Sequence, residues 1–181
     1  MIWNLSPVFP ETEETSAPVI ERYLPSRDYE KHNRELKRAR RFLKQRSQKT
    51  WFEIRLSAVI DPFLEEARQL CEEWKEIELA ASDSGEEVPL CFCHGDYQYH
   101  NILRQDRGFF LVNFEKCQAD GPVRDLYLLL RKLLEKSEWD AEWGRVLLAA
   151  YESVRPLKPY ERQDLVYRLS YPEKLWKIVN F

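Results

Sequence analysis

Glycine is scarce in this 181-residue chain, which contains only Gly85, Gly95, Gly108, Gly121 and Gly144. β-Sandwiches and β-barrels use glycine in many of their turns, so this scarcity argues against both and favours long helices with a few strands. Apolar residues make up 44% and aromatic residues 13% of the chain. That composition excludes a disordered protein and suffices for one domain with a hydrophobic core.

Long apolar runs are missing as well. No segment approaches the roughly 18 apolar residues of a membrane span. The first seven residues, Met-Ile-Trp-Asn-Leu-Ser-Pro, lack the positive region and the apolar core of a signal peptide. We therefore expect a cytoplasmic protein with no membrane partner.

Cysteine is sparse, and two of the four residues, Cys91 and Cys93, are close together in an apolar run. On a strand they would share one face because side chains alternate. Zinc sites usually place two to four residues between paired ligands, so this spacing does not indicate one. We interpret these residues, with Cys71 and Cys117, as buried free thiols in a reducing compartment.

The net charge of −3 provides no general attraction to nucleic acid, so we expect no specific nucleic-acid partner. The charge is unevenly distributed, because residues 27–49 contain ten Lys or Arg and three Asp or Glu. A solvated helix face explains such a run most simply. A basic patch that binds an acidic partner is the alternative.

Proline and apolar spacing divide the first half of the chain. Four prolines make residues 1–27 an irregular lead-in, because proline interrupts helices. Apolar residues at intervals of three, four and seven predict helices over 28–47 and 50–80. Pro62 predicts a break or a new first turn within the second helix.

The pattern of apolar residues changes after a predicted loop at 81–87. Short apolar runs predict strands at 88–93, 101–104 and 109–115, with a turn at 106–108 in which Gly108 can adopt positive φ. Helices then return at 124–136, 138–153 and 160–178. We predict an α+β fold, mostly helical, with a small antiparallel hairpin.

His94-Gly95-Asp96, followed by Asn101, fits the pattern H-x-D-x-x-x-x-N. Phosphoryl transfer needs a carboxylate beside the attacking hydroxyl and oxygen ligands for the metal that neutralises the phosphates. An Asp at the start of a loop can orient or deprotonate the hydroxyl, and an Asn five positions later can bind the metal. A second metal ligand is normally an Asp at the end of the following hairpin. Here that hairpin ends in Asn113-Phe114-Glu115.

With this context, residues 90–135 resemble the C-lobe of the aminoglycoside phosphotransferase and choline kinase group. The similarity is carried by Cys93-His-Gly-Asp-Tyr and by Gly121-Pro-Val-Arg-Asp-Leu. Within that group, Arg124-Asp125-Leu126 and Tyr171-Pro-Glu-Lys-Leu-Trp-Lys-Ile resemble the CotS family of bacterial spore-coat proteins. The resemblance implies a protein-kinase-like C-lobe over residues 28–181 and places the protein in the spore coat.

The resemblance also implies roles for individual residues. Asp96 would be the catalytic base, and Asn101 would be a metal ligand. Asp125 would be a buried acid that holds the loop by accepting backbone N–H bonds, and His94 would be structural. His100 lies where the family varies, and we interpret it as exposed.

The sequence departs from the family at the second metal position. The metal-binding Asp of the family falls at Asn113, and a neutral amide oxygen is a weaker ligand for Mg²⁺. On a strand Asn113 and Glu115 would share a face, so Glu115 could supply the missing charge.

The second departure is the absence of the nucleotide-binding N-lobe. No glycine precedes Gly85, and the pattern of the residues before the loop predicts C-lobe helices. We expect a partial kinase-like chain that is inactive by itself; an active form would use ATP and Mg²⁺. An apolar surface is expected where the N-lobe would dock, and it could mediate self-association.

These features leave three functions open. The first is a truncated or degenerate, non-catalytic phosphotransferase-like protein of the CotS type, acting as a spore-coat component or binding module with coat proteins as partners. The second is an ATP-dependent small-molecule kinase of the aminoglycoside or choline type, completed by an N-lobe on another chain. The third is an unrelated helical protein whose basic helix binds an acidic partner.

Overall fold

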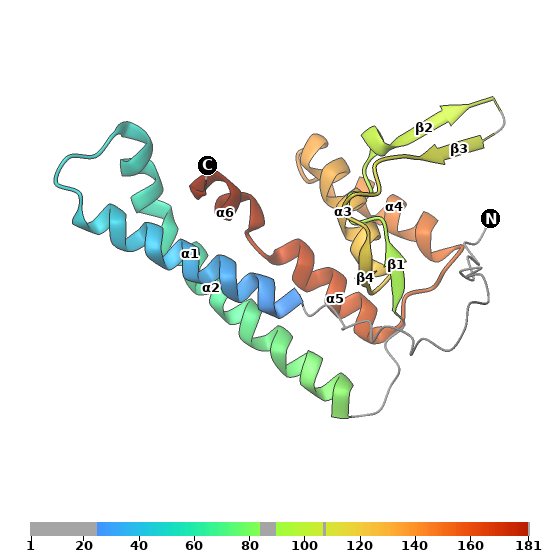
Figure 1. Ribbon diagram of the computed structural model, residues 1–181, viewed down its shortest axis with the longest axis horizontal. Helices are drawn as coiled ribbons and strands as arrows, with labels where there is room; N and C mark the ends of the chain where they lie inside the picture. Colours follow the sequence, from blue (N-terminus) through green and yellow to red (C-terminus); the bar gives the residue numbers. More distant parts are fainter. Residues whose placement is uncertain (1–24, 84–89, 107, 181) are drawn as a thin grey trace, which may run out of the picture.

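A computed structural model describes residues 25–83, 90–106 and 108–180. Two long helices, α1 (Pro25–Gln45) and α2 (Trp51–Asp83), lie side by side along one edge of the molecule (Figure 1). The strands gather toward the opposite end, with α5 (Pro159–Ser170) between them and the long helices. The predicted mostly helical α+β class is therefore confirmed. The lead-in at 1–27 falls largely outside the described residues, and Pro25 occupies the first position of α1, where proline is well tolerated.

The strands form two separate antiparallel pairs. Strand β1 (Cys91–Cys93) pairs with β4 (Gln118–Asp120), and β2 (Ile102–Gln105) pairs with β3 (Gly108–Leu111). The second pair is the predicted hairpin, and Gly108 has a φ of +150°. Strand β4 was not predicted, because three residues with mixed polarity give no periodic signal.

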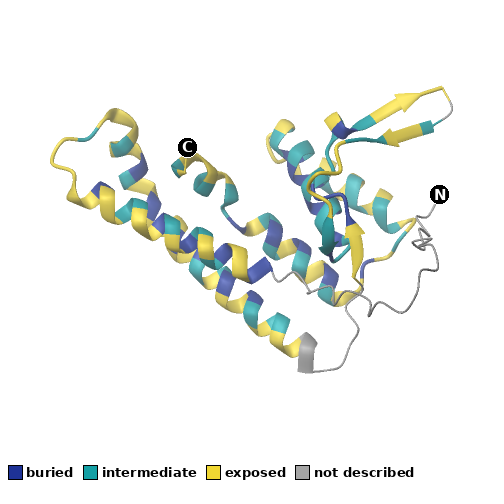
Figure 2. Ribbon diagram, in the orientation of Figure 1, coloured by how far each residue is buried: buried dark blue, intermediate teal, exposed yellow. Residues whose placement is uncertain are grey.

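Helices α3 (Val123–Lys136), α4 (Ala141–Glu152) and α5 enclose the main core. Its buried members are Val123, Leu126, Tyr127, Leu130, Leu134, Leu157 and Leu165. Figure 2 shows buried stretches within α3 and α5, whereas the β2–β3 hairpin is exposed along most of its length. The predicted start of α4 at 138 is wrong. Glu138 and Trp139 have positive φ, and the Asp140 side chain caps the helix by accepting from the N–H groups of Glu142 and Trp143.

The predicted break at Pro62 is also wrong, because α2 runs through it without interruption. Pro62 removes one backbone donor, and the carbonyl that loses its partner belongs to Ala58. Both residues are exposed, so water can replace the bond. On the opposite face Leu56 and Ile60 pack with Leu43 of α1, which keeps the helix straight enough to continue.

The predicted single helix at 160–178 is two helices, α5 and α6 (Glu173–Val179). Tyr171 has an extended backbone immediately before Pro172, the conformation that proline imposes on its predecessor. The break turns Tyr171 into a cluster with Tyr29 and Trp74, where its hydroxyl donates to Asn33 Oδ1 at 2.8 Å. Within the residues the structure describes, no helix combines the length and the apolar character needed to cross a membrane.

Candidate functional site

The loop formed by residues 94–101 lies between β1 and β2, and helix α3 holds its beginning. The Asp125 carboxylate, in the first turn of α3, accepts hydrogen bonds from the backbone N–H groups of His94 at 2.7 Å and Gly95 at 3.0 Å. Hydrogen bonds to a charged acceptor are stronger than neutral ones, so this pair fixes the loop to the helical core. Asp125 is half-buried rather than fully buried, but it makes the backbone contacts expected of it.

His94 braces the loop from within. Its side chain is 4% exposed, its Nδ1 accepts from the Asp96 N–H at 3.2 Å, and its Nε2 lies 2.9 Å from the carbonyl oxygen of Val112. These partners place a ring proton on Nε2. Phe114 packs against the ring with 4.6 Å between the centroids. His94 therefore links the loop to the segment that follows β3, whereas His100 is exposed, as predicted.

Asn101 and Asn113, two of the three predicted metal positions, contact each other. Asn113 Nδ2 donates to Asn101 Oδ1 at 2.9 Å, and Asn101 Nδ2 donates to the carbonyl oxygen of Asp96 at 2.8 Å. Asn101 is 5% exposed, whereas Asn113 is exposed and has a φ of +67°. The amide oxygen that would face a metal thus already accepts a hydrogen bond from its neighbour.

The Asp96 carboxylate forms an ion pair with a lysine of the same chain. Lys116 Nζ lies 3.1 Å from Asp96 Oδ2, and Gln98 Nε2 donates to Asp96 Oδ1 at 2.9 Å. Lys116 and Gln98 were not identified from the sequence, because neither belongs to the H-x-D-x-x-x-x-N pattern. Only the fold brings Lys116, twenty positions later, back to the loop.

Glu115 does not occupy the position that strand alternation predicted. Strand β3 ends at Leu111, and Asn113 has a left-handed backbone, so Asn113 and Glu115 do not share a strand face. Glu115 is exposed in the turn that follows. A role for Glu115 as metal ligand stays a prediction, without the geometric argument that motivated it.

The profile of the phosphotransferase enzyme family (APH) matches residues 20–161. This chain belongs to the phosphotransferase enzyme family. Among solved structures, the aminoglycoside phosphotransferase from Alicyclobacillus acidocaldarius subsp. acidocaldarius DSM 446 superimposes with a TM-score of 0.74 at 21% identity, covering 85% of this chain and 47% of that chain. That likeness establishes the kinase-like fold.

Two further proteins are similar to this member of the phosphotransferase family. Spore coat protein S of Bacillus subtilis (strain 168) is 34% identical over 82 residues, which are 45% of this chain and 23% of that protein. The match to a choline/ethanolamine kinase family protein from Mesorhizobium loti covers 83% of this chain and 54% of that chain, with 19% sequence identity and a TM-score of 0.43. The chain therefore spans under a quarter of the coat protein and about half of each solved structure.

The donors at the expected metal positions of this family member fit Mg²⁺ poorly. Phosphotransferases of this kind use Mg²⁺ to neutralise the phosphates of ATP, and Mg²⁺ prefers carboxylate oxygens and water. Asn101 and Asn113 offer neutral amides bonded to each other, and the Asp96 carboxylate is paired with Lys116. Among the described residues, no three His, Cys, Asp or Glu side chains gather as a metal cluster. The residues at this loop therefore do not fit an Mg²⁺–ATP complex.

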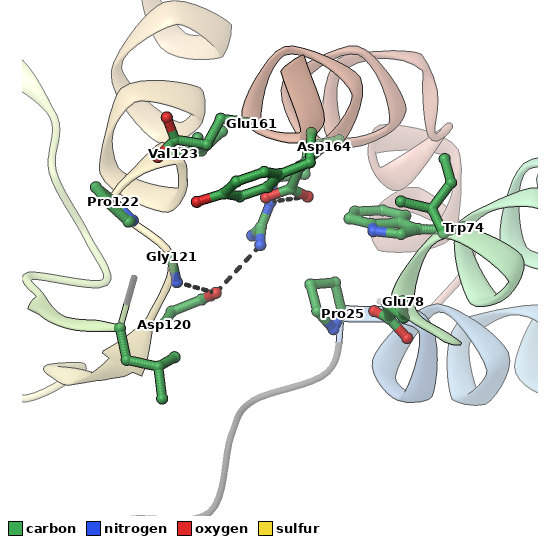
Figure 3. A pocket seen from close by; sticks show the side chains of 13 residues that line it. Pro25, Trp74, Glu78, Asp120, Gly121, Pro122, Val123, Glu161 and Asp164 are labelled. Carbon is green, nitrogen blue, oxygen red and sulfur yellow. Dashed lines mark hydrogen bonds and ion pairs between the residues drawn. The ribbon is translucent and has the colours of Figure 1, made fainter. Parts of the chain in front are cut away.

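A cavity of about 50 Å³ lies elsewhere, between the long helices and the α3–α5 core (Figure 3). Residues of α1, α2, β4, α3 and α5 line it, including Trp74, Asp120 and Arg168, and none comes from the 94–101 loop. Its volume suits one or two water molecules and is far below that of a nucleotide. The cavity is therefore separate from the phosphotransferase-type loop.

Replacing Asp96 by alanine should leave the fold intact, with a loss of less than about 1 kcal/mol in the free energy of unfolding. The lost side-chain contacts are an ion pair with Lys116, which is 66% exposed, and one bond to Gln98. Asp125→Ala is the matched comparison, and it should cost about 2 kcal/mol or more because two backbone donors lose a charged acceptor. Urea denaturation measures both. Equal losses would mean that Asp96 is a structural residue.

Proposed function

We propose that this chain is a non-catalytic phosphotransferase-like protein of the spore-coat type, in which the 94–101 loop is a structural and binding element. The observation that carries the proposal is the hydrogen bond from Asn113 Nδ2 to Asn101 Oδ1 at 2.9 Å. It places an N–H donor where a working enzyme of this type needs a negatively charged oxygen. A cation at this point would first have to displace the donor and turn both amides.

The charge around Asp96 supports the same proposal. A catalytic base must be able to accept a proton from a substrate hydroxyl, with hydrogen-bond access to it. Both carboxylate oxygens of Asp96 have partners within the chain, Lys116 on one and Gln98 on the other. The Asp96 carboxylate is therefore already paired with residues of this chain.

The coat-protein part of the proposal rests on the 34% identity to spore coat protein S over 82 residues. Partners would be other coat proteins that bind through exposed surface. The β2–β3 hairpin offers such a surface, because Leu103, Phe109 and Phe110 are 46%, 71% and 50% exposed next to the loop. Exposed apolar patches of this kind mark interaction sites in many proteins. A fluorescent fusion expressed during sporulation tests the location, and a diffuse cytoplasmic signal throughout sporulation would contradict it.

Calorimetric titration with ATP and Mg²⁺ tests the non-catalytic part directly. We expect no saturable heat at micromolar nucleotide, because the site lacks charged metal ligands. Saturable micromolar binding would overturn the proposal. It would favour the second candidate, a small-molecule kinase that obtains its nucleotide contacts from another chain. That candidate is supported by the Asp125 contacts, which keep the loop backbone ordered.

Asn113→Asp should create an Mg²⁺ site and raise the Mg²⁺ affinity at least about tenfold, equivalent to about 1.4 kcal/mol. The new carboxylate cannot donate to Asn101 Oδ1, so two acceptor oxygens would face each other and attract a cation. The thermal midpoint of the variant should therefore rise with added Mg²⁺, whereas that of the wild type should not. Calorimetry and thermal unfolding with and without Mg²⁺ measure the effect.

Asn113→Gly is the matched control for this experiment. Glycine accepts the left-handed backbone at position 113 and removes the amide without adding charge. Its thermal midpoint should not respond to Mg²⁺. A response equal to that of Asn113→Asp would show that the cation binds elsewhere.

A further inference from the structure

Two free thiols and one carbonyl oxygen meet where β1 pairs with β4. Cys91 Sγ and Cys93 Sγ are 3.6 Å apart, and the carbonyl oxygen of Asp120 lies 3.6 Å from the first and 3.7 Å from the second. The three atoms therefore form a nearly equilateral triangle. Both sulfurs lie within weak hydrogen-bond distance of this shared carbonyl, and Cys93 Sγ also lies 3.3 Å from the carbonyl oxygen of Gly121.

The arrangement follows from strand geometry. Cys91 and Cys93 are two positions apart on β1, so their side chains leave the same face. The antiparallel register places Asp120 opposite Cys91, which brings its carbonyl to the two sulfurs. The prediction that the four thiols are buried is wrong for Cys91 and Cys117, which are exposed, and right for Cys71 and for Cys93, which is 1% exposed. One sulfur is thus anchored in the core, and the other can be reached from solvent.

Asp120 is itself held in place. Its carboxylate accepts from the Gly121 N–H at 2.7 Å and pairs with Arg168 at 3.2 Å (Figure 3). It also pairs with Arg124 at 3.1 Å. Asp120 and Arg168 are each 3% exposed. Because the residue is fixed by buried partners, its carbonyl oxygen keeps its position relative to β1.

We propose that Cys91 Sγ, Cys93 Sγ and the Asp120 carbonyl oxygen form one face of a coordination site for a soft divalent cation of the zinc and cadmium class. An ion at the centre of the triangle would lie about 2.1 Å from each donor, and a small displacement toward solvent gives the Zn–S distance of about 2.3 Å. Water would complete the coordination on the solvent side. Among the described residues no third His, Cys, Asp or Glu side chain joins the two thiols, so the third donor is the backbone carbonyl.

Binding exchanges protons for the cation. Each thiol gives up one proton to solvent, and two thiolates then balance the double charge of the ion. The hydrogen bond between the two thiols lowers the pKa of Cys91, and burial opposes this shift; the same hydrogen bond and burial both raise the pKa of Cys93.

A disulfide fits the same pair less well. Closing it requires the sulfurs to approach from 3.6 Å to about 2.05 Å. Residues two apart on a strand have Cα atoms about 6.6 Å apart, near the upper limit of about 6.8 Å for disulfides. A chelated ion needs almost no shortening of the sulfur–sulfur distance, so the geometry favours coordination over oxidation.

Titration of the reduced chain with Cd²⁺, followed by the ultraviolet sulfur-to-cadmium charge-transfer absorption, tests the site. We expect one saturable equivalent in the wild type and binding at least about tenfold weaker in Cys91→Ser and in Cys93→Ser. Cys117→Ser and Cys71→Ser are matched controls, one exposed and one buried, and both should bind as the wild type does.

Cys91→Ser decides the outcome, because Cys91 is exposed and its replacement should leave the circular dichroism spectrum unchanged. Affinity within twofold of the wild type in folded Cys91→Ser would overturn the proposal. So would loss of the charge-transfer band in Cys117→Ser. None of these results depends on Asn113 or on nucleotide binding, so they are independent of the proposed function.

Discussion

Gly95→Ala is expected to lower the free energy of unfolding by about 3 kcal/mol or more, combining a left-handed backbone penalty of about 1–2 kcal/mol with the cost of overpacking. Gly95 has a φ of +74°, and a Cβ added there would lie 2.0 Å from the carbonyl oxygen of Lys116. That oxygen belongs to backbone, which cannot rotate away as a side chain could. The loop or the 116 turn must shift, and urea denaturation at constant pH measures the cost.

Gly121→Ala is the matched control, because its φ lies outside the left-handed region and a Cβ there would meet no atom within 4 Å. Its change should be smaller than about 0.5 kcal/mol. Similar losses in the two variants would indicate a general intolerance of these turns. A stable Gly95→Ala protein would mean that the contact between the loop and residue 116 is loose in solution.

Arg168→Met is expected to cost about 3–5 kcal/mol, the range for breaking a buried ion pair by removing one partner. The Arg168 side chain is 4% exposed and contacts Asp164 Oδ1 at 2.9 Å and Asp120 Oδ1 at 3.2 Å. Methionine keeps much of the apolar stem but none of the donors, so the buried Asp120 carboxylate and the partly exposed Asp164 carboxylate each lose a positive neighbour. Thermal and chemical denaturation should report the same loss.

Arg145→Met provides the comparison for this variant. Arg145 pairs with Glu142, and both side chains are largely exposed at 69% and 73%. An exposed pair of this kind contributes about 0–1 kcal/mol because water and salt screen it. Equal effects at positions 168 and 145 would mean that the Asp120–Arg168–Asp164 network is solvated and does not fix β4.

The long helices and the loop were the parts most readily predicted from the sequence. Apolar spacing located α1, α2 and α3 to within a few residues, because each buries one face against a neighbour. The H-x-D-x-x-x-x-N pattern located the 94–101 loop, whose spacing follows from local chain geometry. The backbone contacts of Asp125 were inferred from a family resemblance, not from periodicity.

Helix interruptions were harder to predict, because proline alone does not determine them. Pro62 lies inside a continuous helix, whereas Pro172 separates two helices. The difference is tertiary: Pro62 faces solvent on a helix whose other face is packed. Tyr171, before Pro172, is drawn into the cluster with Tyr29 and Trp74.

By itself, the sequence determined that this is a mostly helical chain with a phosphotransferase-type loop and a neutral residue at position 113, because these features depend on local spacing and residue type. Tertiary structure alone decided what surrounds them. Folding brings Lys116 to Asp96, sets Asn113 against Asn101, and places the Asp120 carbonyl beside Cys91 and Cys93. Contacts between residues twelve to thirty positions apart depend on where each strand ends and on which strand it pairs with. Strands as short as these give no periodic sequence pattern from which their ends or their pairing could be predicted.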